Sequence, residues 1–135
     1  MKFEAKQNTI FSRGEMLENP NFSGCAWRQA LTNRAELNCS VSNITFSPGC
    51  RNSWHIHPGG QLLLVLSGRG WYQEENKPAQ ELKPGDVVEI PIGVKHWHGA
   101  AKDSEFVHLC IITNPQNGPC QWLEPVADAD YDALP

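Results

Sequence analysis

The sequence predicts an all-β domain, an antiparallel sandwich or barrel, from three observations. Ten prolines and eleven glycines are spread along the 135 residues and separate many short apolar runs. This spacing is typical of strands joined by tight turns. Several runs alternate apolar and polar residues and are rich in β-branched side chains, which favours strands over helices. The middle of the chain contains no convincing helical pattern. We therefore expect strands throughout it.

One domain is expected over residues 1–135, since a chain of this length can bury one hydrophobic core but not two. The core of this domain is expected at about 35–113. An extended N-terminal arm over 1–24 precedes the core, and a C-terminal tail over 114–135 follows it.

The first part of the chain predicts one helical turn and two strands. Residues 12–17 match a capping box, with Ser12 as the cap and Glu15 three residues later, so one helical turn is expected there. Strands are expected over Cys25 to Leu31 and over Glu36 to Phe46. The second of these alternates over most of its length, which is typical of a half-buried strand.

The remaining strands are expected between clusters of turn residues. They cover residues 53–57, 61–67, 70–75, 80–83, 87–90, 95–99 and 106–112. From Thr113 the chain is loop-like. Its acidic end, residues 124–132, is expected to pack back as a short strand or a helical turn.

Charge and composition restrict the class of partner. The net charge is -4 and no basic run is present, which argues against a nucleic-acid or anionic-membrane surface. Small molecules or proteins are therefore the expected partners. The N-terminus lacks the hydrophobic centre of a signal peptide, and no apolar run approaches membrane-spanning length. We expect a cytoplasmic protein whose five cysteines, none of them in a Cys-x-x-Cys pair, are reduced.

The histidines indicate a metal site. His55 and His57 stand two apart in an extended segment, so both side chains point to one face with Cα atoms about 6.6 Å apart. His96 and His98 repeat this spacing. Any three of these imidazoles, together with the Gln61 amide oxygen, would provide four ligands and leave positions open for water or substrate. An open position is characteristic of catalytic metal sites.

The same residues resemble the two motifs of the cupin superfamily. The first motif runs Gly, five residues, His-x-His, three or four residues, Glu, six residues, Gly. The positions that match it are Gly49, His55, His57, Gln61 and Gly68, with Gln61 in the place of Glu. The second motif runs Gly, five residues, Pro-x-Gly, two residues, His, three residues, Asn. The positions that match it are Gly85, Pro91, Gly93 and His96, with Ala100 in the place of Asn.

This resemblance implies a jelly-roll β-barrel, also called a double-stranded β-helix, that forms a homodimer. It also implies a metal ion held by four ligands, which are His55, His57, Gln61 and His96. The segments 54–58 and 95–100 further resemble small single-domain cupins related to manganese-dependent hydroxynitrile lyases and to cupins associated with carboxymuconolactone decarboxylases. In those lyases Gln replaces Glu as a ligand.

The resemblance to this subgroup covers nearly the whole chain, since Phe22-Ser23-Gly24 and Trp122-Leu123-Glu124 share it. It implies that His108 is a pocket histidine rather than a metal ligand. By the same match, Ser42 and Ile44 line the pocket beside the metal.

A neutral amide at Gln61 has a chemical consequence. It leaves the full charge of a divalent ion uncompensated, so Lewis-acid chemistry is favoured over oxygen activation. Manganese, iron, nickel, cobalt and zinc all accept nitrogen and oxygen ligands of this kind, and manganese or zinc is favoured here.

His98 and His108 are the candidate catalytic acid or base. Alternatively, His98 hydrogen-bonds a strand edge or orients a ligand, and His108 is an ordinary core histidine. Trp54 and Trp97 alternate with the ligands and should point away from the metal, toward the partner sheet or a second subunit. Arg51 is expected in solvent or at the barrel mouth.

Three functions are compatible with these residues. The first is a metal-dependent lyase, with cyanohydrin cleavage as its most specific form. The second is an iron-dependent dioxygenase, and the third is a protein that binds a small ligand without catalysis, because a fold and a metal site do not fix the reaction.

Overall fold

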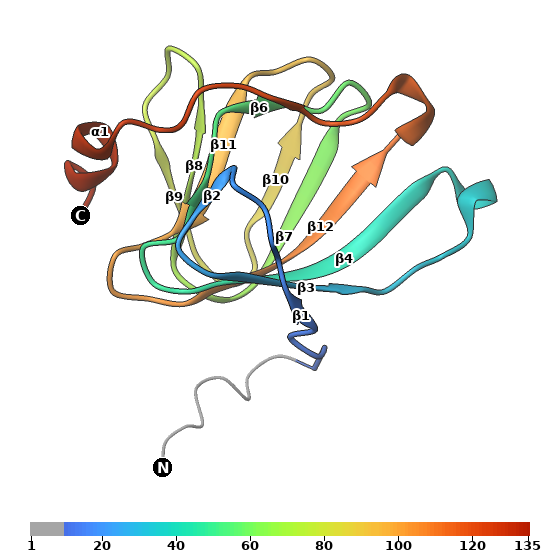
Figure 1. The fold of residues 1–135 in the computed structure, drawn as a ribbon, viewed down its shortest axis with the longest axis horizontal. Coiled ribbons are helices and arrows are strands. Elements are labelled where there is room, and N and C mark those ends of the chain that lie inside the picture. The colour runs from blue at the N-terminus through green and yellow to red at the C-terminus, as the bar shows by residue number, and fades with distance from the viewer. Residues whose placement is uncertain (1–9) are drawn as a thin grey trace.

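Residues 10–135 form two antiparallel β-sheets in the computed structural model, which describes this part of the chain (Figure 1). The arm before residue 10 lies outside the described residues. The first sheet has six strands, in the order β1 (Glu15–Met16), β3 (Ala26–Ala30), β4 (Cys39–Phe46), β12 (Phe106–Thr113), β7 (Gln61–Gly68) and β10 (Val87–Ile90).

The second sheet is assembled from shorter strands. Their order is β13 (Gln121–Trp122), β6 (His55–Ile56), β11 (His96–Ala100), β5 (Arg51–Asn52) and β2 (Phe22–Ser23). The strand β8 (Gly70–Glu74) pairs with β11 and with β9 (Gln80–Leu82). Several sheet neighbours lie far apart in the sequence, and β12 pairs with both β4 and β7. The structure thus confirms the expected antiparallel jelly-roll fold.

The main hydrophobic core lies between the two sheets. Phe46, Leu63 and Phe106 from the first sheet are fully buried against Ala100 of the second. Along β7, side chains alternate between this core and the outer face of the first sheet, where Leu64 stays partly exposed. This alternation fixes which side chains face the interior.

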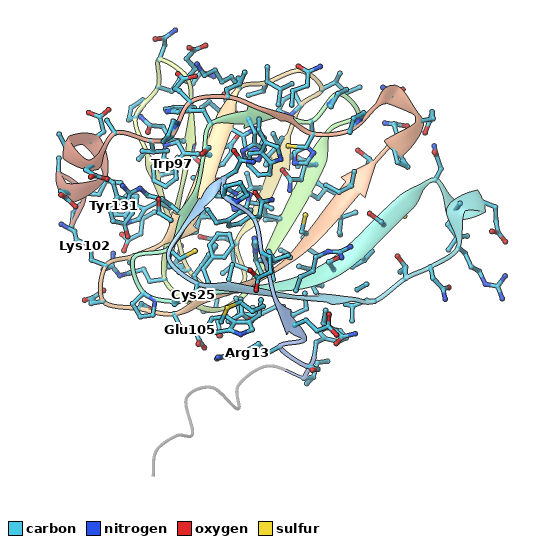
Figure 2. The ribbon with its side chains drawn as sticks, viewed as in Figure 1. Arg13, Cys25, Trp97, Lys102, Glu105 and Tyr131 are labelled. Atoms are coloured by element: carbon cyan, nitrogen blue, oxygen red, sulfur yellow. The ribbon has the colours of Figure 1, made fainter. Side chains whose placement is uncertain are left out.

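A second apolar cluster covers the outer side of the second sheet. Trp97 packs there against Tyr131 of helix α1 (Asp128–Asp132), with ring centroids 6.1 Å apart (Figure 2). The Tyr131 hydroxyl donates to the Ala100 carbonyl at 2.6 Å. Trp97 therefore points away from the histidines as expected, but the end of the same chain covers it.

The prediction for Arg51 is wrong. Its side chain is buried, its guanidinium carbon lies 4.2 Å from the centroid of the Tyr131 ring, and it pairs with Asp128. The helix α1 supplies both partners, so the buried charge is compensated by contacts that are distant in sequence.

The predicted helical turn over residues 12–17 is also wrong. Glu15 and Met16 form β1 and pair with Arg28 and Trp27 of β3. An isolated helical turn is costly to nucleate, so pairing with β3 overrides the local capping signal. The two-residue strands β2 and β5 were not expected, since such short segments carry no periodicity.

Helical structure in the described residues is limited to α1 and two 3₁₀ segments, η2 (Ala35–Leu37) and η3 (Pro115–Asn117). Because η2 occupies residues 35–37, the strand expected from Glu36 begins only at Cys39. Within residues 10–135, no helix combines the length and the apolar character needed to cross a membrane.

Candidate metal centre

The four residues implied as ligands lie together where the two sheets meet. His55 of β6 and His96 of β11 pair directly across the strands, and their ring centroids are 4.2 Å apart. His57 lies just after β6, with its ring 5.1 Å from His55 and 5.9 Å from His96. Gln61 comes from β7 in the other sheet, and its Oε1 lies 3.1 Å from Nε2 of His96.

These separations suit one shared ion. Imidazoles bonded to the same ion through metal–nitrogen bonds of about 2.1 Å place their ring centroids roughly 4.5–6 Å apart. The three observed separations, 4.2, 5.1 and 5.9 Å, are close to that interval. Little movement is needed for the rings to share a ligand.

The surroundings of His96 favour a bound cation. Its Nδ1 faces the Val94 carbonyl at 3.0 Å and its Nε2 faces the Gln61 Oε1 at 3.1 Å. A neutral imidazole has one N–H, so in one of these two contacts a ring nitrogen without a proton faces an oxygen that is also an acceptor. Burial lowers the pKa of His96, which disfavours the doubly protonated ring. A metal ion held by His96 and Gln61 would satisfy both lone pairs.

His55 and His57 are also neutral. The Nδ1–H of His55 faces the Ser53 carbonyl at 2.7 Å, which leaves Nε2 as the donor atom for a metal. Burial, and then the neighbouring His96, lower the pKa of His55 well below its usual value. The same two causes lower the pKa of His57 to about 4. Their lone pairs are therefore available at neutral pH.

Cys110 fixes the orientation of the Gln61 amide. The Gln61 Nε2 donates to the Cys110 Sγ at 3.0 Å, so the amide oxygen is turned toward His96. Cys110 comes from the neighbouring strand β12 and had no expected role. No local sequence signal could identify it, because the contact depends on the β7–β12 register.

A cavity of about 190 Å³ adjoins these residues. Its volume is below the range of about 300–1,000 Å³ usual for drug-sized ligands, so it suits a small molecule. Apolar side chains provide much of its lining. Its lining residues are Leu17, Asn19, Phe22, Arg28, Ile44, Phe46, Asn52, His55, His57, Gln61, His98, His108, Cys110 and Trp122.

His98 lines this cavity, and Asn52 fixes the tautomer of its ring. The Asn52 Oδ1 accepts the backbone N–H of His98 at 2.9 Å, so the Asn52 Nδ2 faces the His98 Nε2 at 3.2 Å and donates to it. Neutral His98 therefore carries its proton on Nδ1. This buried nitrogen has no partner among residues 10–135.

His108 is the freer of the two rings. Both of its nitrogens are buried without a hydrogen-bond partner in the described part of the chain. Burial lowers the pKa of His108 to about 3, so the ring is neutral and one of its nitrogens carries a free lone pair. Its centroid lies 5.0 Å from that of His98. These buried polar atoms are free to bind a polar ligand or an ordered water in the cavity.

The two residues expected to line the pocket occupy different positions. Ile44 lines the cavity. Ser42 is buried on the same strand and pairs in register with Cys110, but it is not among the lining residues. Asn52, which holds His98, was not anticipated.

The donor atoms form two groups that meet at His55. Those of His55, His96 and His98 lie within 4.8 Å of one another, and so do those of His55, His57 and Cys120. Because Asn52 engages the Nε2 of His98, we consider His98 the weaker ligand. In the implied set of His55, His57, Gln61 and His96, the lone pairs that would bind the metal remain available.

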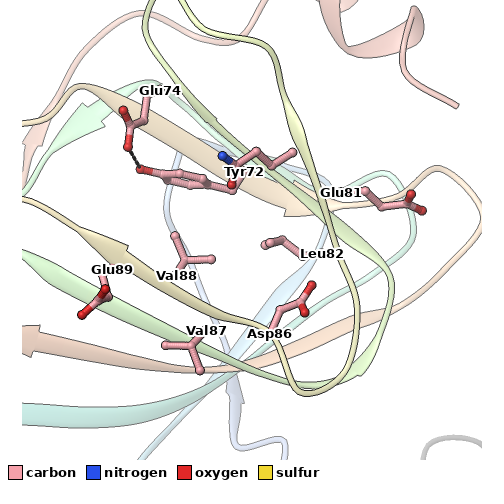
Figure 3. Close-up of a pocket in the computed structure, with 9 residues that line it drawn as sticks. Tyr72, Glu74, Glu81, Leu82, Asp86, Val87, Val88 and Glu89 are labelled. Carbon is pink, nitrogen blue, oxygen red and sulfur yellow. Dashed lines mark hydrogen bonds between the residues drawn. The ribbon is translucent and has the colours of Figure 1, made fainter.

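A second hollow lies between the β8–β9 hairpin and β10 (Figure 3). Its volume is about 300 Å³, and its lining includes Glu74, Glu81, Asp86 and Glu89. The Tyr72 hydroxyl donates to the Glu74 carboxylate at 2.8 Å. Glu81 pairs with Arg69 and Asp86 with Lys83. Among residues 10–135, none that lines this hollow has a buried side-chain polar atom without a partner.

The sequence and the fold are similar to those of known proteins. Residues 42–112 match the family model described as "Cupin domain". An (R)-mandelonitrile lyase from Granulicella tundricola is 44% identical over 90 residues, which cover 67% of this chain and 69% of that protein. An acireductone dioxygenase from Stutzerimonas stutzeri is 26% identical over 78 residues, and these span 55% of this chain and 43% of that protein.

Among solved structures, a cupin-like protein from Thermotoga maritima superposes with a TM-score of 0.88 and 47% sequence identity. The similarity covers 91% of this chain and 94% of that one. The match therefore extends well beyond the residues of the family model.

Proposed function

This chain belongs to the cupin family, and on that premise we propose that it is a metal-dependent lyase acting on a small hydroxy or carbonyl compound. Cyanohydrin cleavage is the most specific form of the proposal. The observation that carries it is the 44% identity to a mandelonitrile lyase. The clustering of His55, His57, Gln61 and His96 beside a small cavity supports it.

The four clustered residues would hold one divalent ion. Manganese and zinc suit three imidazoles and an amide oxygen, and iron, nickel and cobalt also accept them. When bound, the ion supplies Lewis-acid polarisation of a substrate oxygen. The protein keeps the donors neutral by burial and fixes the Gln61 oxygen through Cys110.

His108 and His98 have complementary roles in the proposal. A free nitrogen of neutral His108 accepts the hydroxyl proton of the cyanohydrin. The bond between carbon and the nitrile then breaks, and its electron pair leaves with cyanide. The Nδ1–H of His98 hydrogen-bonds this leaving group. The proton held by His108 is finally transferred to cyanide, so the products are a carbonyl compound and hydrogen cyanide.

The decisive experiment joins elemental analysis to an activity assay. We expect about one divalent ion per chain, and release of benzaldehyde from (R)-mandelonitrile that is lost in His55→Ala. Absence of a stoichiometric metal, with His55→Ala and His57→Ala leaving metal content unchanged, would contradict the proposal. Stabilisation by the nitrile without turnover would instead indicate a ligand-binding protein.

The second candidate is an iron-dependent dioxygenase. It is favoured by the similarity to acireductone dioxygenases. Substrate-dependent oxygen uptake by the iron(II)-loaded protein, without cyanohydrin cleavage, would support it over the lyase. The neutral Gln61 argues against it, because a carboxylate ligand stabilises trivalent iron better than an amide does.

A homodimer completes the proposal. The outer face of the first sheet carries Leu64 next to Val87 and Leu109, which are its cross-strand neighbours. Val87 is 61% exposed, and the two leucines are partly exposed. A second copy packed on this face would bury these side chains.

A further inference from the structure

Cys120 lies beside the metal-binding histidines although it is outside the family motifs. The C-terminal segment, residues 114–135, runs from the end of β12 across β6 to α1 (Figure 1). Its strand β13 pairs Gln121 with Ile56 and Trp122 with His55. Cys120 precedes this strand and so lies opposite the His-x-His stretch. Its Sγ and one nitrogen each of His55 and His57 are all within 4.8 Å of one another.

The position of Cys120 is held by contacts on the C-terminal segment. The Leu123 N–H donates to the Trp54 carbonyl at 2.8 Å, and the Trp54 N–H donates to the Glu124 carbonyl at 3.0 Å. The Trp122 ring lies 4.8 Å from the His55 ring. These contacts join the segment to Trp54 and His55, so the thiol is placed by the fold.

The donor set also lacks a negative charge. Gln61 replaces the carboxylate of the first cupin motif, and no Asp or Glu is among the residues lining the cavity. Three neutral imidazoles and an amide leave a divalent ion with its full charge. A coordinating thiol is deprotonated by the ion it binds, so Cys120 can supply the missing charge.

Cys110 does not offer the same possibility. Its Sγ accepts the hydrogen bond from Gln61 that turns the amide oxygen toward His96. Cys25 is exposed on β3's N-terminal side, and Cys39 opens β4 beside the 3₁₀ segment η2. Cys120 is the thiol grouped with two of the implied ligands in the described residues.

We infer that Cys120 is an additional metal ligand, which the C-terminal segment brings to the site formed by His55, His57, Gln61 and His96. Binding forms a metal–sulfur bond and releases the thiol proton to solvent. The inference rests on the proposed metal site and extends it. A thiolate prefers zinc, cobalt and iron over manganese, so the metal preference shifts toward the softer ions.

Cobalt substitution tests the inference without any activity assay. Wild-type protein loaded with one equivalent of cobalt(II) should show a near-ultraviolet sulfur-to-cobalt charge-transfer band. Cys120→Ser should lose this band, and the matched control Cys25→Ser should keep it. A band that survives in Cys120→Ser overturns the inference.

The same titration separates this inference from the proposed function. Stoichiometric cobalt bound to the wild type without a charge-transfer band overturns the thiolate and leaves the metal site in place. No cobalt or zinc bound at all overturns both. We also expect Cys120→Ser to weaken zinc binding by at least about tenfold and manganese binding by much less.

A measurement on the wild-type chain covers the case in which the variant does not fold. Alkylation of each cysteine is mapped by mass spectrometry with and without zinc. Zinc should slow the alkylation of Cys120 at least about tenfold, the same factor as the loss of zinc affinity expected for Cys120→Ser. The alkylation rate of Cys25 should be unchanged. Equal alkylation of Cys120 in the two samples would overturn the inference.

Discussion

His98 and His108 share one cavity but differ in what their nitrogens face. Asn52 binds His98 through both its amide groups and so fixes the tautomer of the ring. His108 has no such partner in the described residues. Two histidines of equal burial therefore acquire different chemistry, one as a fixed donor and one as a free acceptor.

The first prediction concerns His108. Replacing it in His108→Phe preserves apolar contacts with Phe46 and Phe106, whose rings lie within 5.5 Å of it. Turnover should fall by about 10²–10⁴-fold, because the proton acceptor is lost. Metal content should stay unchanged, as measured by elemental analysis. Full activity in this variant would exclude His108 as the base.

A second prediction concerns the amide of Gln61. In Cys110→Val the Gln61 Nε2 loses its acceptor, so the amide oxygen is no longer held toward His96. Metal affinity measured by chelator competition should fall by about 10–100-fold, as for other groups that orient a ligand. Cys110→Ser retains an acceptor and should recover most of the affinity. Equal affinity in the two variants would show that the contact has no influence.

At the scale of elements, the structural role of helix α1 is not evident from the sequence. It is short and acidic, yet it covers Trp97 and compensates the buried Arg51 (Figure 2). Lys102 also donates to the Asp132 carbonyl at 2.7 Å. Since β11 carries His96 and His98 on one face and Trp97 on the other, this helix supports the strand from the side opposite the histidine cluster.

The third prediction tests this support. Tyr131→Ala should lower the free energy of unfolding by about 3–5 kcal/mol, since a large buried aromatic side chain is removed. The matched variant Tyr131→Phe keeps the ring and loses only the hydrogen bond to Ala100, so it should cost about 1–2 kcal/mol. Denaturant titration gives both values. If the two variants were equally stable, the ring contact with Trp97 would be unimportant.

For the whole molecule, the outer face of the first sheet is the proposed dimer interface. The fourth prediction is that Leu64→Glu converts a dimer to a monomer, because the charge would be buried in the interface. Light scattering after gel filtration measures this, and Glu89→Gln on the same face is the control. A monomeric wild type would contradict the proposed homodimer.

The fifth prediction concerns acid stability of the metal-free protein. Burial lowers the pKa of all five histidines, to about 4 for His57 and about 3 for His108. Below their ordinary value of 6.5 the unfolded chain binds more protons than the folded one. The contribution of the histidines to the free energy of unfolding is therefore fully present above pH 6.5. It is lost as the pH falls toward 3.

Each such histidine contributes a slope of at most about 1.4 kcal/mol per pH unit within its window. Denaturant titrations of chelator-treated protein between these pH values measure the total. In His108→Phe the slope should be smaller by up to about 1.4 kcal/mol per pH unit, which corresponds to one proton fewer taken up on unfolding. A flat profile over this interval would show that the histidines are not buried as neutral rings.

The sequence by itself determined the strand content, the jelly-roll expectation and the histidines proposed to hold a metal. Period-two alternation and turn residues are local, and the spacing of the His-x-His stretch places two imidazoles on one face wherever the strand lies. These features depend on a few neighbouring residues. Among the described strands, β7, β10, β11 and β12 accordingly appear close to their expected positions.

Only the tertiary structure decided the contacts between distant segments. Cys110 on Gln61, Asn52 on His98 and Cys120 beside His57 each join residues that lie far apart in the sequence. The same holds for β1, which takes its conformation from pairing with β3 rather than from its own capping signal. Such contacts follow from strand register and chain reversal, which no local pattern encodes.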